Sequence, residues 1–351
     1  MDTSVLQMLK GQQHAREFLE RISKNPEGGF IFFGPDGVGK RTAAILFAAA
    51  VNPPSYSQDI FDLKVPDISP LFPFKAPPDT KTDKWLEDWG DEKEKYALNK
   101  ISPVFPSSSV IPIGNKDKEL VGTIRDLRRE MRFPPRVLKK RVALLFDFDR
   151  IRESGANAFL KTLEEPQHDT VLILTTSRPF ALLPTIRSRC KMVRFKELPD
   201  EVVREYLLNQ GFDEEDAGIA TDVAFGSLRQ AFKYLADRDK FISENILDWL
   251  EKPSSSSVAL GNLIDSLSWR VSLERIIHSF AVVFRWTLRA RTGRHPSWKR
   301  LAGIVESISL NISTPSLVHN IMLTEKMASR VSLNPTPSLF LYSYLTSLKF
   351  N

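Results

Sequence analysis

Residues 28–50, GGFIFFGPDGVGKRTAAILFAAA, carry the most informative pattern in this chain. An apolar run typical of a buried strand leads into a glycine-rich loop, and a helical pattern follows the loop. Backbone N–H groups of such a loop can surround a phosphate, because glycine tolerates the required dihedral angles and the next helix adds its positive end. An ordinary glycine turn is the simpler alternative. We expect a nucleotide site, with these loop residues as its phosphate contacts: Gly34, Gly37, Gly39 and Lys40.

The same pattern departs from what hydrolysis needs. Magnesium in such sites is held by a hydroxyl directly after the lysine and by an acidic residue that ends a second strand. Here Arg41 follows Lys40, and Thr42 comes one place late. In the predicted second strand, apolar Phe146 precedes Asp147. The sequence therefore leaves nucleotide binding open and predicts that hydrolysis is weak or lost.

Strands and helices alternate through the first part of the chain, which is typical of a parallel sheet with helical crossovers. After residues 28–50, the patterns predict a helix within 118–133, strands over 141–149 and 170–177, a helix over 153–165, and a short helix ending near Cys190. From Pro199 onward the chain is predicted to be helical. We therefore expect an α/β fold followed by helical domains.

These patterns divide the chain into three domains, with boundaries at 1–197, 198–238 and 239–351. The first is a nucleotide-binding-like α/β domain, and the other two are helical. Within the first domain, residues 52–118 form a proline-rich insertion, since ten prolines lie between Asn52 and Gly114. We expect a long surface loop there, without a compact helix or sheet.

Composition excludes several classes of protein. No apolar run approaches the roughly 18 residues that a membrane span requires, so no membrane partner is expected. The first residues, MDTSVLQMLKGQQ, do not resemble a secretory signal, and we expect a cytoplasmic location. A single cysteine, Cys190, excludes an internal disulfide, and the five histidines are scattered without metal-ligand spacing. The formal charge of +6 allows a polyanionic partner without demonstrating one.

Several motifs in combination resemble the AAA+ clamp-loader subunits, and most of all the delta-prime type of the bacterial DNA polymerase III holoenzyme. The run DRIRESGANAFLKTLEEP at 149–166 is followed by TTSRPFALLPTIRSRC at 175–190, which ends in the Ser-Arg-Cys of the family. Gly-Gln at 11–12, GSLRQAF at 226–232 and NPTPSLFLYSYL at 334–345 agree with the family in order and spacing. The resemblance implies an AAA+ P-loop module with a parallel sheet, a small helical lid (198–238) and an all-helical collar for oligomerisation (239–351).

The resemblance also implies roles for individual residues. Arg189 would be an arginine finger that acts in trans on the ATP of a neighbouring subunit. Arg229 would contact nucleotide bound to its own chain, together with Thr42 and the loop. Phe146 takes the place of the magnesium-binding aspartate, and Asp147 that of the catalytic acid, so the ATPase site of the chain itself would be degenerate. The four cysteines of the family's zinc module are missing, so no zinc is expected.

The implied function is that of a subunit that helps to load the sliding clamp onto primed DNA, with other clamp-loader subunits as partners. ATP is an allowed cofactor, and its hydrolysis by this chain is not expected. Basic residues before the second strand are candidates for sequence-independent phosphate contacts with DNA, although such a run is also typical of a solvated face: Arg125, Arg128, Arg129 and Arg132.

Two alternatives remain open. The first is an active ATPase subunit of a clamp loader, gamma/tau-like, with Thr42 replacing the lost hydroxyl and Asp147 with Asp149 holding the metal. Register argues against it, because one residue along a helix rotates a side chain by about 100°. The second is a P-loop enzyme acting on a small molecule, for which the sequence shows no acceptor pocket. Arg189 and Arg187 could also be plain surface charges at a helix end.

Overall fold

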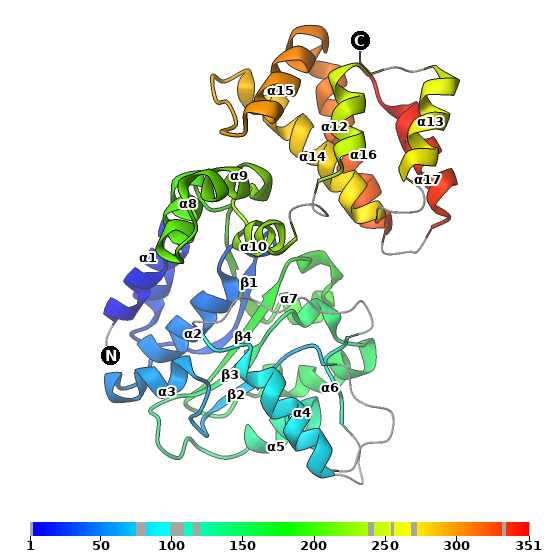
Figure 1. Cartoon of the computed structure of the whole chain (residues 1–351). Coiled ribbons are helices and arrows are strands. Elements are labelled where there is room, and N and C mark those ends of the chain that lie inside the picture. Colours follow the sequence, from blue (N-terminus) through cyan, green and yellow to red (C-terminus); the bar gives the residue numbers. More distant parts are fainter. Residues whose placement is uncertain are drawn as a thin grey trace. The chain divides into compact units, whose positions relative to one another are not determined.

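The computed structural model describes residues 3–74, 82–98, 109–114, 120–237, 242–253, 256–267, 272–331 and 335–350. The chain forms two compact units, one of Met1–Val202 with Gly226–Arg229 and the other of Val203–Phe225 with Gln230–Asn351. Figure 1 labels most of the helices and strands of both. The division into three domains at 1–197, 198–238 and 239–351 stays a prediction.

A five-stranded parallel sheet organises the first unit, with the strands in the order β2-β3-β4-β1-β5. Every residue of β3 and β4 is buried, as expected for a parallel sheet that is covered on both faces. The expected α/β class and three of its strands are thereby confirmed. In chain order the strands are β1 (Gly28–Phe33), β2 (Ile68–Leu71), β3 (Arg141–Leu145), β4 (Thr170–Thr176) and β5 (Cys190–Arg194).

Alternate residues of each strand point to opposite faces of the sheet and build two separate cores. Phe30 and Phe32 of β1 pack on the side of α2, where the Phe30 and Phe47 rings meet edge to face at 5.5 Å. Ile31 packs on the other side, with residues of α5, α6 and α7. The helices of this unit are α1 (Gln13–Ile22), α2 (Lys40–Ala50), α3 (Ser57–Phe61), α4 (Thr82–Glu94), α5 (Ile124–Glu130), α6 (Glu153–Glu164) and α7 (Pro184–Arg187), and α8 (Asp200–Asn209) begins at its end. Short 3-10 helices lie at Thr3–Met8 (η1), Pro54–Tyr56 (η2), Phe148–Arg150 (η3) and Pro179–Ala181 (η4).

The expectation for residues 52–118 is wrong where the structure describes them. This segment contributes α3, α4 and an edge strand of the sheet, β2. Pro70 fits in β2 because an edge strand needs no hydrogen-bond donor on its open side. Tyr96, just after α4, is 1% exposed and belongs to the core on the α2 side. The described part of the insertion is therefore structural, whereas 75–81, 99–108 and 115–118 lie outside the described residues.

The described residues of the second unit form helices and connecting segments, without a strand. Buried Ile276, Ile277, Phe280 and Phe284 give α14 an apolar face. The helices are α9 (Glu214–Ala224), α10 (Leu228–Ala236), α12 (Glu244–Glu251), α13 (Ser257–Leu267), α14 (Leu273–Ala290), α15 (Lys299–Asn311), α16 (Thr314–Val331) and α17 (Pro337–Ser347). None of the helices in the described parts of either unit is long and apolar enough to cross a membrane.

Candidate functional site

The predicted strand, loop and helix are present, with the loop running from the end of β1 to the start of α2. Gly34, Gly37 and Gly39 have φ angles of 152°, 73° and 95°. A side chain at Gly34 would place its Cβ 2.1 Å from the carbonyl oxygen of Phe195. Only glycine suits these positions, so the backbone has the form of a phosphate-binding loop.

Lys40 is turned back onto its own loop. Its Nζ donates to the carbonyl oxygens of Gly34 and Pro35 at 2.8 and 2.5 Å, and the residue is 6% exposed. Burial lowers the pKa of Lys40, and nearby Asp36 and Asp147 oppose this shift. A phosphate group would therefore have to draw the ammonium away from two carbonyl oxygens before Lys40 could bind it.

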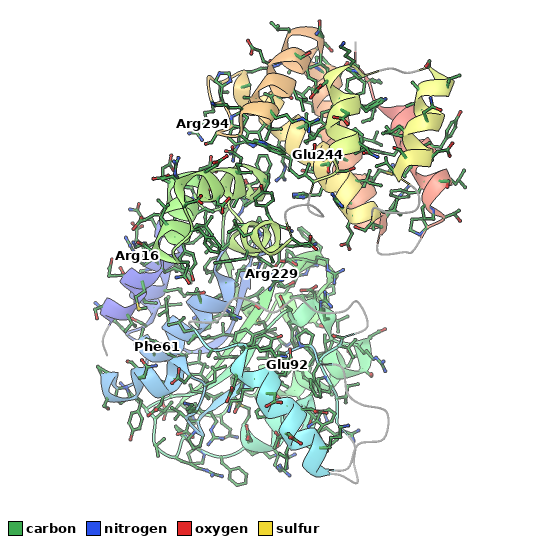
Figure 2. The ribbon with its side chains drawn as sticks, in the orientation of Figure 1. Arg16, Phe61, Glu92, Arg229, Glu244 and Arg294 are labelled. Carbon is green, nitrogen blue, oxygen red and sulfur yellow. The ribbon has the colours of Figure 1, made fainter. Side chains whose placement is uncertain are left out.

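The segment that carries Arg229 lies directly against the loop. The backbone N–H of Leu228 donates to the carbonyl oxygen of Gly37 at 3.0 Å, and a Cβ at Gly37 would be 2.3 Å from Ser227 Oγ. Arg229, labelled in Figure 2, pairs its Nη1 with Oδ2 of Asp36 at 2.7 Å. Arg229 is thus beside the phosphate loop, and its charge is already balanced by a carboxylate of that loop.

An aromatic stack lies beside Arg41 and includes Phe146. The Tyr96 ring stacks between Phe72 and Phe146, with centroid distances of 4.4 and 5.1 Å. The Arg41 guanidinium lies 5.9 Å from the Tyr96 centroid, and its Nη1 donates to the carbonyl oxygen of Lys95 at 3.2 Å. At the two positions that the sequence pattern and the resemblance assign to the hydroxyl and the carboxylate stand a guanidinium and a buried phenyl ring, and neither can ligate a cation. The residues at these two positions do not fit Mg²⁺.

The two aspartates after β3 have different surroundings. Burial raises the pKa of Asp147, with Arg229 opposing the shift, and its backbone N–H donates to Thr175 Oγ1 at 3.0 Å. Asp149 accepts from Thr176 Oγ1 at 2.7 Å and from Arg178 Nε at 2.9 Å. Asp149 is therefore engaged by its neighbours. Across the described residues, His, Cys, Asp and Glu form no group of three or more that could hold a metal ion.

Arg189 lies on the surface of the first unit, just after α7. Its Nη1 donates to the carbonyl oxygen of Thr185 at 3.0 Å, and its Nη2 pairs with Oε1 of Glu164 at 2.9 Å. The side chain is 38% exposed. The guanidinium is thus held in one orientation while it stays accessible from outside the chain.

The four arginines proposed to contact DNA lie on and just after α5. Arg129 and Arg132 are exposed, and Arg125 and Arg128 are half-buried. Arg129 pairs with Asp126 at 2.8 Å, so part of its charge is balanced within the helix. A role of these residues in DNA binding stays a prediction.

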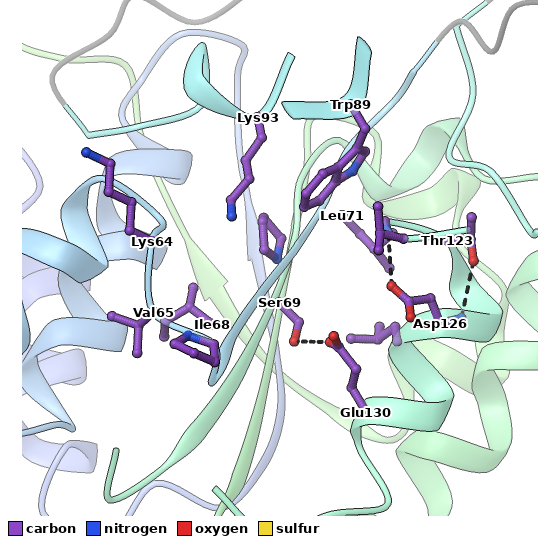
Figure 3. A pocket seen from close by; sticks show the side chains of 15 residues that line it. Lys64, Val65, Ile68, Ser69, Leu71, Trp89, Lys93, Thr123, Asp126 and Glu130 are labelled. Carbon is purple, nitrogen blue, oxygen red and sulfur yellow. Dashed lines mark hydrogen bonds between the residues drawn. The ribbon is translucent and has the colours of Figure 1, made fainter. Parts of the chain in front are cut away.

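A cavity of about 230 Å³ lies between β2, α4 and α5, and sequence reasoning did not anticipate it (Figure 3). Ser69 Oγ donates to Glu130 Oε2 at 2.6 Å, and burial raises the pKa of Glu130. Asp126 accepts from the backbone N–H of Gly122 at 3.0 Å. Much of the polar lining is therefore engaged in hydrogen bonds with other lining residues. The cavity lies where the insertion packs against the edge of the sheet, which accounts for it structurally.

Gln12 has a role that its motif alone did not reveal. It is 4% exposed, and its Nε2 donates to the carbonyl oxygens of Val38 and Lys196 at 3.1 and 2.6 Å. The backbone N–H of Lys196 donates to its Oε1 at 3.1 Å. Gln12 therefore connects the phosphate loop to the chain after β5. The signal in the sequence was the Gly-Gln pair, whose partners only the fold brings together.

Comparisons with known proteins agree with these motifs. The family model for "DNA polymerase III, delta subunit" matches residues 102–199. The chain is 28% identical over 195 residues to DNA polymerase III subunit tau of Bacillus subtilis (strain 168), covering 55% of this chain and 29% of that protein. It is 51% identical over 51 residues to DNA polymerase III subunit delta' of Pseudomonas aeruginosa, covering 14% of this chain and 16% of that one. A gamma-subunit-related protein of Thermotoga maritima has a similar solved structure, with a TM-score of 0.42, 19% identity, and coverage of 94% of this chain and 96% of that one.

The sheet order, the phosphate loop after β1 and the helical second unit define an AAA+ P-loop module. Within that class, the matched family model and the relatives, which are delta' subunits of DNA polymerase III, support a member of the clamp-loader family. The matched segments span well under half the length of the first curated relatives, so the activity of the whole protein is a matter for proposal.

Proposed function

We propose that this chain is a clamp-loader subunit of delta-prime type, which supplies Arg189 to the ATP site of a neighbouring subunit and does not hydrolyse ATP itself. In this role it assembles with other DNA polymerase III subunits and helps to place the sliding clamp on primed DNA. The four basic side chains of the α5 segment are candidates for contacts with DNA phosphates: Arg125, Arg128, Arg129 and Arg132.

The observation that carries the proposal is the environment of Arg189. An arginine finger must be accessible and already oriented, because its guanidinium stabilises charge on the γ-phosphate only in the transition state. The hydrogen bond to Thr185 and the ion pair with Glu164 orient it from behind, and more than a third of the side chain is exposed. An exposed ion pair of this kind contributes at most about 1 kcal/mol, so Glu164 can release Arg189 when a more negative partner arrives.

The surroundings of the phosphate loop support the second part of the proposal, that the chain does not hydrolyse ATP itself. Arg41 and Phe146 are unable to ligate magnesium, and Tyr96 from the insertion stacks on Phe146. If ATP binds at Gly34, Gly37, Gly39 and Lys40, we expect its affinity to be the same with Mg²⁺ and with a chelator. Binding of a fluorescent ATP analogue to the purified chain tests this, and strongly magnesium-dependent binding would contradict it.

The finger is tested in a loader reconstituted with the DNA polymerase III subunits of the same organism. Arg189→Ala should lower clamp- and DNA-stimulated ATP turnover at the served site by on the order of 10³, the low end for arginine fingers. Arg189→Lys should recover little, because an ammonium lacks the planar pair of donors. Arg204→Ala is the control, since Arg204 is also exposed and paired, with Glu214. If the Arg189→Ala loader turns over ATP as fast as the Arg204→Ala control, Arg189 is not an arginine finger.

A second candidate is an active ATPase subunit, which the match to a tau subunit over 195 residues favours. It requires Thr42, Asp147 and Asp149 to hold magnesium, although Asp149 is already bonded to Thr176 and Arg178. Turnover by the isolated chain that disappears in Lys40→Ala would support this candidate over the first.

A further inference from the structure

An exposed aromatic side chain lies on the same surface segment as Arg189. Phe180 is 86% exposed, the highest value among the large apolar side chains that the structure describes. It belongs to the 3-10 turn η4, Pro179–Ala181, which follows the end of β4. Pro179 fixes the first backbone angle of this turn, so the ring is presented by a short, constrained segment. A phenylalanine so fully solvated is a candidate for contact with another molecule.

Arg187 contacts the ring of Phe180. Its guanidinium carbon lies 5.3 Å from the centroid of that ring, within the range of a cation–π contact. Arg187 comes from α7, two residues before Arg189. Its Nε is buried and has no hydrogen-bond partner among the described residues. The two side chains are therefore in contact with each other, on the same segment of the chain as the proposed finger.

The segment around this pair is strongly cationic. Between Thr170 and Lys196 the chain contains no aspartate or glutamate. Two of its cations are balanced from other elements, since Arg178 pairs with Asp149 and Arg189 with Glu164. The six cationic residues of the segment are Arg178, Arg187, Arg189, Lys191, Arg194 and Lys196.

We infer that Phe180 and Arg187 anchor this chain to the nucleotide-holding face of the neighbouring clamp-loader subunit. This inference rests on the proposed function, because it names the partner of the surface that carries Arg189. A protein face that carries a bound triphosphate is anionic and complements the cationic segment. Aromatic and arginine side chains dominate the binding energy of protein interfaces. Phe180 thus supplies affinity, while Arg189 supplies chemistry.

The experiment separates these two contributions. The full-length chain is titrated against the purified gamma/tau-type subunit of the same organism, and both the dissociation constant and the ATP turnover at saturation are measured. Phe180→Ala should weaken binding by about 30-fold, as expected for an interface hot spot, with turnover at saturation unchanged. Arg187→Ala should weaken binding less, and Phe180→Tyr should retain most of the affinity.

The controls make failure of this inference distinct from failure of the finger. Phe133→Ala removes another exposed phenylalanine of the same unit, 56% exposed, and should leave the affinity unchanged. Arg189→Ala should bind almost as well as the wild type while turnover falls. Wild-type affinity of Phe180→Ala would overturn the anchor, whatever Arg189→Ala does. Loss of primed-DNA binding by Phe180→Ala, with subunit affinity intact, would also overturn it and assign the pair to nucleic acid.

Discussion

Asp36 and Arg229 are 193 positions apart in the chain, yet their side chains meet at 2.7 Å beside the phosphate loop. Asp36 is itself a residue of that loop. Its negatively charged carboxylate would therefore repel an incoming phosphate group. The guanidinium that could attract the phosphate is engaged by this carboxylate. The pair therefore opposes nucleotide binding in two ways at once.

Removing the charge of Asp36 should strengthen nucleotide binding. In Asp36→Asn the repulsion disappears and Arg229 becomes available, and a gain of about tenfold in ATP affinity is expected for one unit charge near the surface. Titration with a fluorescent ATP analogue at low salt measures the gain, which should shrink as salt is added. Asp62→Asn, which also removes one surface carboxylate, should change nothing. Unchanged or weaker binding by Asp36→Asn would contradict this account.

The Tyr96 stack should be essential for the stability of the first unit. Tyr96→Ala removes a buried ring between Phe72 and Phe146, and a loss of about 3 to 5 kcal/mol in the free energy of unfolding is expected. Urea denaturation followed by tryptophan fluorescence measures it. Tyr342→Ala, at a tyrosine that is 50% exposed, should stay within about 0.5 kcal/mol of the wild type. A loss no larger than that of the control would show that the insertion does not support the sheet.

The strands that the sequence predicted are the buried ones. β1, β3 and β4 appear as continuous apolar runs because both of their faces are covered. The two missed strands are the edges of the sheet: β2 contains Pro70, and much of β5 is exposed. Period and hydrophobicity are weak signals at an edge, where half of the backbone groups have no partner strand.

The sequence motifs likewise indicated where individual side chains lie, but not which groups those side chains contact. Lys40 and Arg229 lie near the phosphate loop as their motifs suggest, since local backbone form carries that signal. The ion pair of Arg189 with Glu164 depends on how α6 and α7 pack, which no local pattern encodes. The sequence likewise does not predict that the insertion folds back and places Tyr96 against Phe146, because distant contacts determine the path of a loop.

A buried ion pair should make the first unit sensitive to acid. Asp67 is 0% exposed, pairs with Arg141 at 2.8 Å, and accepts backbone hydrogen bonds from residues 136–138. Burial alone would raise the pKa of Asp67, but these donors outweigh it and hold the pKa below the ordinary 3.8. The stabilisation is therefore fully present above about pH 4 and is lost as the pH falls through the folded-state pKa.

Asp67→Asn tests this dependence. It leaves Arg141 buried without its counter-charge, and a loss of about 3 to 5 kcal/mol at pH 7 is expected. Urea unfolding between pH 7 and pH 2 should show a shallower acid limb for this variant than for the wild type. Asp59→Asn, at an exposed carboxylate, serves as the control. Parallel acid limbs for Asp67→Asn and the wild type would exclude Asp67 as a source of the pH dependence.

His278 should give the second unit a separate pH dependence at milder acidity. Burial in α14 lowers the pKa of His278 from 6.5 to about 4, with Lys233 and Arg285 adding to the shift and a hydrogen bond to the Val223 backbone opposing it. Below pH 6.5, His278 therefore becomes protonated in the unfolded chain, whereas in the folded chain it stays neutral until the pH approaches 4. Stability should fall by about 2 kcal/mol between pH 7 and pH 5. His278→Gln keeps an N–H donor but does not titrate, so its unfolding midpoint in urea should change much less over this range. His295→Gln, at an exposed histidine, should follow the wild type, and a His278→Gln curve that also follows it would refute the assignment.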